Sequence, residues 1–271
     1  MARLPSAHQP ERFETVSHEM NDEDKLALFS QDHYRALFAQ LKRAGYQSVK
    51  FEALSSETAE VYIRHDVDYS VEAALEVARW DADLGLSTDF FVMVDTAFYS
   101  VGQTRVRHQL REIRALGHRI GLHFDQGGML EAGEEVGSRA RIDAEILSLA
   151  CGENVEVLTF HRPTRRAHGG GVSTAPIRHP RDSPQLRAVE YISDSRGLFR
   201  FGSPIESASF RNRKPLHLLL HPIWWVNHRE HHSVAILESF LIQRSNWLRH
   251  EMMLHSTPFA EHSRQGGNDD K

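Results

Sequence analysis

The stretch that decides the fold is Val61-Tyr62-Ile63-Arg64-His65-Asp66-Val67-Asp68. Its residues alternate between two faces in the period-two pattern of an extended strand. Because residues two apart in a strand project to the same face, Asp66 and Asp68 are predicted to point into one pocket. Two carboxylates this close repel each other unless a cation or a shared proton separates their roles. A polar strand end followed by an Asp that caps a helix gives the same pattern, so this stretch alone leaves both interpretations open.

Predicted strands and helices alternate along the rest of the chain. Ser70 is a predicted N-cap, and Gly45, Gly85 and Gly117 are predicted to end helices. Such alternation favours parallel pairing. The fold class is therefore α/β, a distorted (β/α) barrel with about seven parallel strands. The predicted strands are residues 61–65, 89–94, 119–123, 155–160, 189–192 and 216–220, and the last helix is predicted at 233–254 with Leu241 and Leu248 turned inward.

Length and composition favour one globular domain. The chain has 271 residues, 40% of them hydrophobic, and a net charge of -5. Lysine and arginine are scattered rather than striped, which argues against a nucleic-acid partner. The one cysteine, Cys151, excludes an intramolecular disulfide. No apolar run of signal-peptide length begins the chain, and no segment has the roughly 20 apolar residues of a membrane span. We therefore expect a soluble, cytoplasmic protein.

Local composition predicts three parts. Residues 1–24 are polar without periodicity and are predicted to form a loosely held arm. Residues 25–262 form the single domain, and residues 263–271 are predicted to be disordered. A long loop is predicted over residues 163–187, where prolines and three consecutive glycines interrupt the pattern.

Polar residues follow five of the predicted strands. In parallel α/β barrels the chemistry lies at the carboxyl ends of the strands. Each residue alone has another explanation, such as a helix cap, a turn aspartate or a core histidine. Separate explanations of this kind account poorly for all five groups together. The groups therefore predict a functional site. The groups are Asp66 with Asp68, His123 with Asp125, His161 with Arg162, Asp194 with Arg196, and His221.

This set of strand-end motifs resembles the polysaccharide deacetylase superfamily, which is carbohydrate esterase family four with the NodB-homology fold. The resemblance covers roughly residues 60–225. It implies that Asp66 is the catalytic base and Asp68 a metal ligand. His123, in the motif Gly117-His118-Arg119-Ile120-Gly121-Leu122-His123, corresponds to the family's first ligand histidine. Arg162, followed by Pro163, would hold Asp66 in orientation and keep it ionised. His221, at the end of Leu218-Leu219-Leu220-His221, would be the general acid.

One departure from the family pattern concerns the metal. Four residues after His123, where the family has a second ligand histidine, this chain has Gly127. We predict that His161 supplies the third ligand, with Asp125 as the alternative. Imidazole suits zinc and similar divalent ions, so the expected cofactor is a divalent metal, Zn²⁺.

The leading functional hypothesis is a metal-dependent hydrolase that removes an N-acetyl group from an amino sugar or a glycan precursor. By resemblance, its setting would be surface polysaccharide or lipopolysaccharide biosynthesis, with a carbohydrate substrate as partner. Trp224 and Trp225 are predicted to line the substrate site, although one of the two is expected to be core. Asp194 and Arg196 are predicted to bind substrate hydroxyls or to form an ion pair. The alternatives are a non-catalytic carbohydrate-binding or scaffold protein, favoured by Gly127, and a hydrolase of a small amide.

Overall fold

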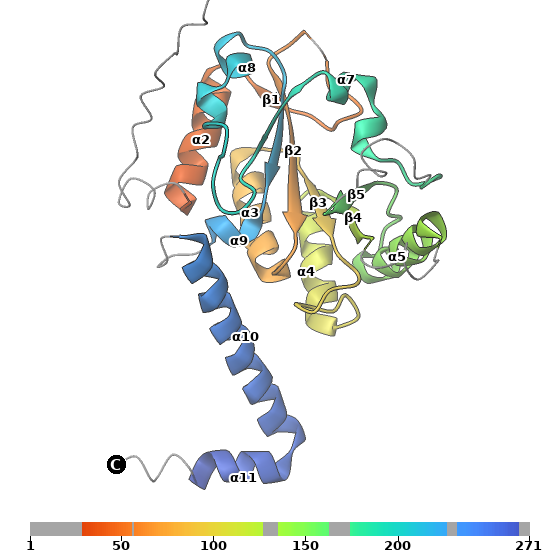
Figure 1. Ribbon diagram of the computed structural model, residues 1–271, viewed down its shortest axis with the longest axis vertical. Coiled ribbons are helices and arrows are strands. Elements are labelled where there is room, and N and C mark those ends of the chain that lie inside the picture. The colour runs from red at the N-terminus through yellow and green to blue at the C-terminus, as the bar shows by residue number, and fades with distance from the viewer. Residues whose placement is uncertain (1–28, 56, 127–134, 163–173, 227–231, 266–271) are drawn as a thin grey trace, which may run out of the picture.

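A parallel seven-stranded sheet forms the centre of the protein (Figure 1). The computed structural model describes residues 29–55, 57–126, 135–162, 174–226 and 232–265. The strand order is β5-β4-β3-β2-β7-β6, and β1 pairs with the start of β2. This confirms the predicted α/β class with about seven parallel strands. The strands are β1 (Gln47–Ser48), β2 (Glu60–Val67), β3 (Asp89–Val92), β4 (Arg119–Asp125), β5 (Leu158–His161), β6 (Glu190–Ser193) and β7 (Leu216–Leu220).

Helices follow the strands and cover the sheet. Ser70 accepts a hydrogen bond from Ala73 N at the start of α3, and Gly85 ends that helix with a φ of 70°. Both residues act as predicted, because a Ser side chain satisfies a free helical N–H and Gly tolerates a positive φ. The long helices are α2 (Gln31–Arg43), α3 (Val71–Leu84), α4 (Thr104–Ala115) and α5 (Val136–Cys151). The short ones are η1 (Pro180–Asp182), α7 (Pro184–Arg187), η2 (Pro204–Glu206), α8 (Ala208–Arg211) and α9 (Pro222–Trp225).

Strand β2 is anchored by polar contacts on both of its faces. On the helix side, His65 Nε2 lies 2.8 Å from Asp81 Oδ2 of α3. On the opposite face, the Tyr62 hydroxyl donates to Asp89 of β3 over 3.0 Å. A shift of one residue would exchange the two faces and break both contacts. Two separate contacts therefore fix the strand register that turns Asp66 toward the interior.

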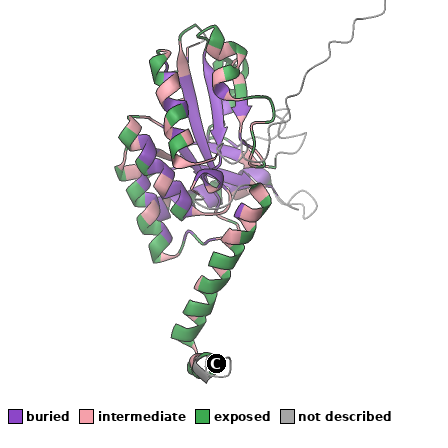
Figure 2. Ribbon diagram, turned by 90° about the vertical axis from the view of Figure 1, so that its left-hand side faces the viewer, coloured by how far each residue is buried: buried purple, intermediate pink, exposed green. Residues whose placement is uncertain are grey.

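Helix α10 (Ser233–His255) departs from the prediction. It leaves the domain and carries α11 (Thr257–Gln265) at its far end (Figures 1 and 2). Leu241 and Leu248 were expected to face inward, but they are 55% and 49% exposed. Helix α11 includes residues 263–265, the first three of the predicted tail. Residues 1–24, the predicted arm, lie outside the described part of the chain. No helix within the described ranges is long and apolar enough to cross a membrane.

Close packing between β3 and β4 gives a stability prediction. A Cβ added to Gly121 would lie 2.5 Å from the buried Phe91 ring and 3.0 Å from Val157. Gly121→Ala is therefore expected to lower the free energy of unfolding by about 1–3 kcal/mol, because the core must move to relieve the overlap. Chemical denaturation measures this change. The control is Gly102→Ala, whose new Cβ meets only Ser100 Oγ at 3.6 Å; equal stability of the two variants would contradict the packing argument.

Candidate active site

One large cavity opens at the carboxyl ends of the strands. Its volume is about 1510 Å³. The predicted base, metal ligands and acid all line it, although they come from β2 and the residue after it, from β4 and β5, and from the end of β7. The residues are Asp66, Asp68, His123, His161 and His221. The structure therefore brings together the residues that the strand-end rule predicted to form one site.

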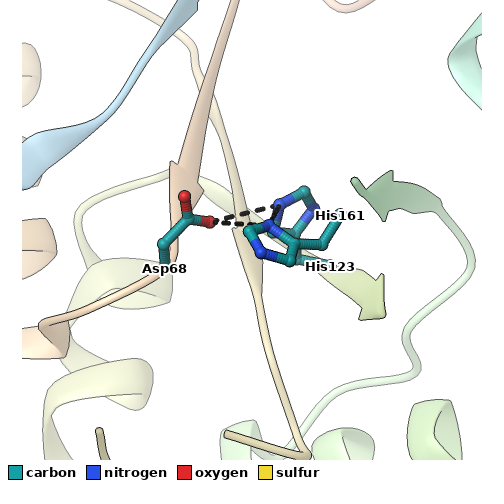
Figure 3. A group of neighbouring side chains, drawn as sticks. All are labelled: Asp68, His123 and His161. Carbon is teal, nitrogen blue, oxygen red and sulfur yellow. Dashed lines mark hydrogen bonds and ion pairs between the residues drawn. The ribbon is translucent and has the colours of Figure 1, made fainter. Parts of the chain in front are cut away.

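Asp68, His123 and His161 form a compact group of metal-ligand atoms (Figure 3). Asp68 Oδ1 lies 3.2 Å from His123 Nε2 and 3.5 Å from His161 Nδ1. The two imidazole nitrogens are 3.2 Å apart. Among the described residues, Asp125 is not part of this group, and Gly127 lies outside the described residues. The predicted replacement ligand, His161, is thus the third member of the group.

The chemistry of these three atoms fits a divalent cation. His123 Nδ1 contacts Thr159 Oγ1 at 2.9 Å, so a proton on Nδ1 leaves the Nε2 lone pair directed at the group. A carboxylate oxygen and two imidazole lone pairs that face one another repel unless a proton or a cation lies between them. Ligands around a tetrahedral zinc lie about 3.3–3.4 Å apart. The observed separations of 3.2, 3.2 and 3.5 Å agree with that spacing.

Electrostatics within the group are strongly coupled. Burial acts to raise the pKa of the Asp68 carboxyl, but contacts with His123 and His161 outweigh it and hold the pKa well below its usual value. Burial acts to lower the pKa of His161, yet the contact with Asp68 raises it overall. In the absence of a cation the group therefore retains a proton readily, and binding of a metal would release it.

Asp66 is held by an arginine other than the one expected. Arg64 Nη2 donates to Asp66 Oδ2 over 3.0 Å, and both residues are buried. Arg162, predicted for this role, instead forms an ion pair with Asp125 and is 72% exposed. Arg64 reaches Asp66 because it precedes Asp66 by two residues on β2 and projects to the same face. Asp66 Oδ2 also lies 3.5 Å from His123 Nε2, beside the ligand group.

His221 is oriented by a buried carboxylate. Its Nδ1 lies 2.6 Å from Asp194 Oδ1, and its backbone N–H donates to both oxygens of Asp194 over 3.0 Å. Trp225 Nε1 donates to the same carboxylate over 2.8 Å. This arrangement leaves His221 Nε2 facing the ligand group, 3.8 Å from Asp68 Oδ2. Burial acts to lower the pKa of His221, but Asp194 more than compensates and raises it to about 9.

Of the four residues predicted to bind substrate, two line the cavity and two are fully buried away from it. Trp224 lines the cavity, whereas Trp225 is fully buried in the core and holds Asp194, so one of the two is core as expected. They lie on the short helix α9 rather than on a strand. Asp194 is wholly buried and contacts His221 and Trp225 instead of Arg196. Arg196 lines the cavity with a φ of 68°.

Two site residues received no role from the sequence. Arg64 could have been found from the same alternation that placed Asp66 and Asp68 on one face. Thr159 lies opposite His123 in the register of β4 and β5. That pairing gives no signal in the sequence until the strand order is known.

Comparison with protein-family models and with curated proteins finds no match. The chain is similar to deacetylase PplD of Streptococcus pyogenes in complex with acetate, at 11% identity and a TM-score of 0.41, over 70% of this chain and 80% of that one. It is similar to a family 4 acetyl xylan esterase from Clostridium thermocellum in complex with a cobalt ion, at 13% identity and a TM-score of 0.37, over 68% and 84%. It is also similar to the polysaccharide deacetylase Bc1974 from Bacillus cereus, at 14% identity and a TM-score of 0.37, over 68% and 88%.

Proposed function

We propose that this protein is a metal-dependent hydrolase that removes the N-acetyl group from an amino sugar or a glycan precursor, as in the polysaccharide deacetylase superfamily. The observation that carries the proposal is the convergence of a candidate metal-ligand group, a carboxylate and an imidazole in one cavity. Asp68, His123 and His161 offer three ligand atoms to a cation. Asp66 lies within 3.5 Å of this group and His221 within 3.8 Å of it. A carboxylate base and an imidazole acid beside a metal site are the parts that amide hydrolysis requires.

The base is positioned to accept a proton. A divalent ion held by Asp68, His123 and His161 would polarise the amide carbonyl and make a water molecule more acidic. Asp66 Oδ1 is buried and has no hydrogen-bond partner among the described residues. Arg64 fixes the other oxygen of the same carboxylate. Asp66 therefore has one oxygen for orientation and one to take the proton of the attacking water.

His221 is the proposed general acid for the second proton transfer. Cleavage of the amide C–N bond leaves an amine, which departs only if its nitrogen is protonated. Asp194 holds His221 Nδ1 and favours the charged imidazolium, so Nε2 carries a proton toward the cavity. Transfer of that proton to the nitrogen yields the free amino sugar and acetate.

The finer parts of the proposal concern the metal and the setting. Zinc is proposed because two imidazoles and one carboxylate form a common zinc donor set. An acetylated sugar is proposed from the resemblance of the strand-end motifs. A cytoplasmic location and a role in surface polysaccharide or lipopolysaccharide biosynthesis belong to the same proposal and rest on the sequence features alone.

Two measurements on the purified protein test the proposal. Elemental analysis is expected to find about one divalent ion per chain, and N-acetylated sugars are expected to release acetate. A protein that binds no metal and releases no acetate would instead support a non-catalytic carbohydrate-binding function. Release of acetate from small amides but from no sugar would support a different C–N hydrolase.

The contact between Asp194 and His221 gives a prediction for the pH profile. An acid must be protonated, so kcat/KM should fall as the pH rises through the His221 pKa of about 9. Asp194→Asn removes the charge that raises this pKa, and the alkaline limb should therefore move to lower pH. The pH dependence of kcat/KM measures the shift, with the exposed Asp83→Asn as control. An unchanged alkaline limb in a folded Asp194→Asn protein would show that His221 is not the acid.

A further inference from the structure

The cavity extends from the ligand group toward the amino ends of the strands into a basic region formed by Arg64, His179, Arg181 and His217. Arg64 lies two residues before Asp66, and His217 of β7 pairs in register with Tyr62 of β2. Residues two apart on one face of a strand are separated by about 7 Å. Arg64, whose Nη2 contacts Asp66, therefore forms the near end of the basic region, and His217, level with Tyr62, lies two such steps from Asp66 along the sheet.

His217 is an unusual residue to bury. It is 4% exposed and lies between the rings of Tyr62 and Tyr191, with both centroids at 5.0 Å. Its Nε2 has no hydrogen-bond partner among the described residues. A buried polar atom without a partner lowers stability, so one that is present calls for a functional explanation.

The side chains whose charges act on the pKa of His217 are all basic. Burial lowers the pKa of His217 well below its usual value, and Arg64, Arg181 and His179 lower it further. Arg64 also has a buried Nε with no partner in the described part of the chain, because Asp66 engages only its Nη2. A neutral imidazole still donates through one N–H. The region thus combines basic side chains with two buried nitrogen atoms that have no hydrogen-bond partner among the described residues.

We infer that the basic region binds an oxyanion, a phosphate or a carboxylate, carried by the acetylated sugar. Arginine and histidine N–H groups form strong, charge-assisted hydrogen bonds with such groups. The inference rests on the proposed function, because that function places the acetyl group beside Asp66, and the basic region extends from there along the same cavity. The substrate class is then an anionic N-acetyl sugar rather than a neutral polymer.

Calorimetric titration of the protein as purified tests the inference without requiring turnover. The ligands are N-acetylglucosamine, its 1-phosphate and N-acetylmuramic acid, together with inorganic phosphate alone. At least one anionic sugar is expected to bind about tenfold or more tightly than the neutral one. Preference for the phosphate ester or for the carboxylate identifies the natural oxyanion. Equal affinity for the neutral and both anionic sugars, with no binding of inorganic phosphate, would overturn the inference.

Two variants separate ligand binding from a structural role. His217→Phe keeps the ring between the two tyrosines and removes the unpartnered nitrogen, so it should raise Tm while it weakens binding of the anionic sugar. A fall in Tm with unchanged affinity would show that His217 is structural. Arg181→Ala, on the exposed η1, should weaken the same binding without affecting the fold. The control is Arg200→Ala, an exposed arginine outside the cavity, which should bind like the unmodified protein.

Acetate release distinguishes this inference from the proposed function. If anion binding depends on Arg181 but no sugar releases acetate, the oxyanion site is supported and the proposed hydrolase function is contradicted. If neutral and anionic sugars release acetate at equal rates and bind with equal affinity, the oxyanion site is contradicted and the proposed hydrolase function is supported.

Discussion

Asp66→Asn is expected to lower kcat/KM for acetate release by about 10²–10⁴-fold while the metal content stays unchanged. The amide has nearly the shape of the carboxylate, and its oxygen can still accept the hydrogen bond from Arg64. It cannot take a proton from water. Rate measurements and elemental analysis on the same preparation test both parts of the prediction.

The matched control for this substitution is Asp125→Asn. Asp125 lines the same cavity but pairs with Arg162 and lies outside the ligand group. Its loss should change the rate far less than the loss of Asp66. An equal loss in both variants, or disappearance of the metal from Asp66→Asn, would contradict the separation of base and ligand.

His161→Ala is expected to remove the metal and with it the activity. Two ligands would remain, Asp68 and His123, and a two-ligand site holds a divalent ion poorly. Loss of residues that merely support metal ligands already costs 10–100-fold in affinity. We therefore expect the affinity to fall by more than about 100-fold. Elemental analysis after dialysis and titration with zinc measure the loss.

His179→Ala is the control for metal content. His179 lines the same cavity but is not among the three clustered ligand atoms, so its replacement should leave the metal in place. Retention of metal in His161→Ala, combined with its loss in Asp125→Ala, would identify Asp125 as the third ligand instead.

Much of the scaffold could be predicted because local patterns and the final structure agree. The alternation around Asp66 predicted β2, and Ser70 and Gly85 correctly marked the two ends of α3. The rule for strand ends then predicted which residues lie together in one cavity, without any knowledge of the strand order. Strand β1 was missed, because a pair of residues is too short to carry a periodic signal.

The errors arose where a role depends on spatial reach rather than on sequence spacing. Arg162 was assigned to Asp66 from a motif, but Asp125 lies nearer to its guanidinium. The apolar pattern of α10 predicted an inward face, yet the helix extends away from the body of the domain (Figure 2), and Leu241 and Leu248 are exposed. Periodicity reports which residues share a face, but it does not report whether anything packs against that face.

The position of β7 has a consequence for how the protein is made. Although β7 is the last strand in the described part of the chain, it pairs with β2 on one side and β6 on the other. A growing chain that has reached α7 already contains Asp68, His123 and His161, but it lacks His221. Pairing between segments so distant in sequence is slow, because a long loop must close before the contacts form. The three grouped ligand residues are therefore synthesised before His221, and the β7 side of β2 remains unpaired until β7 has been made.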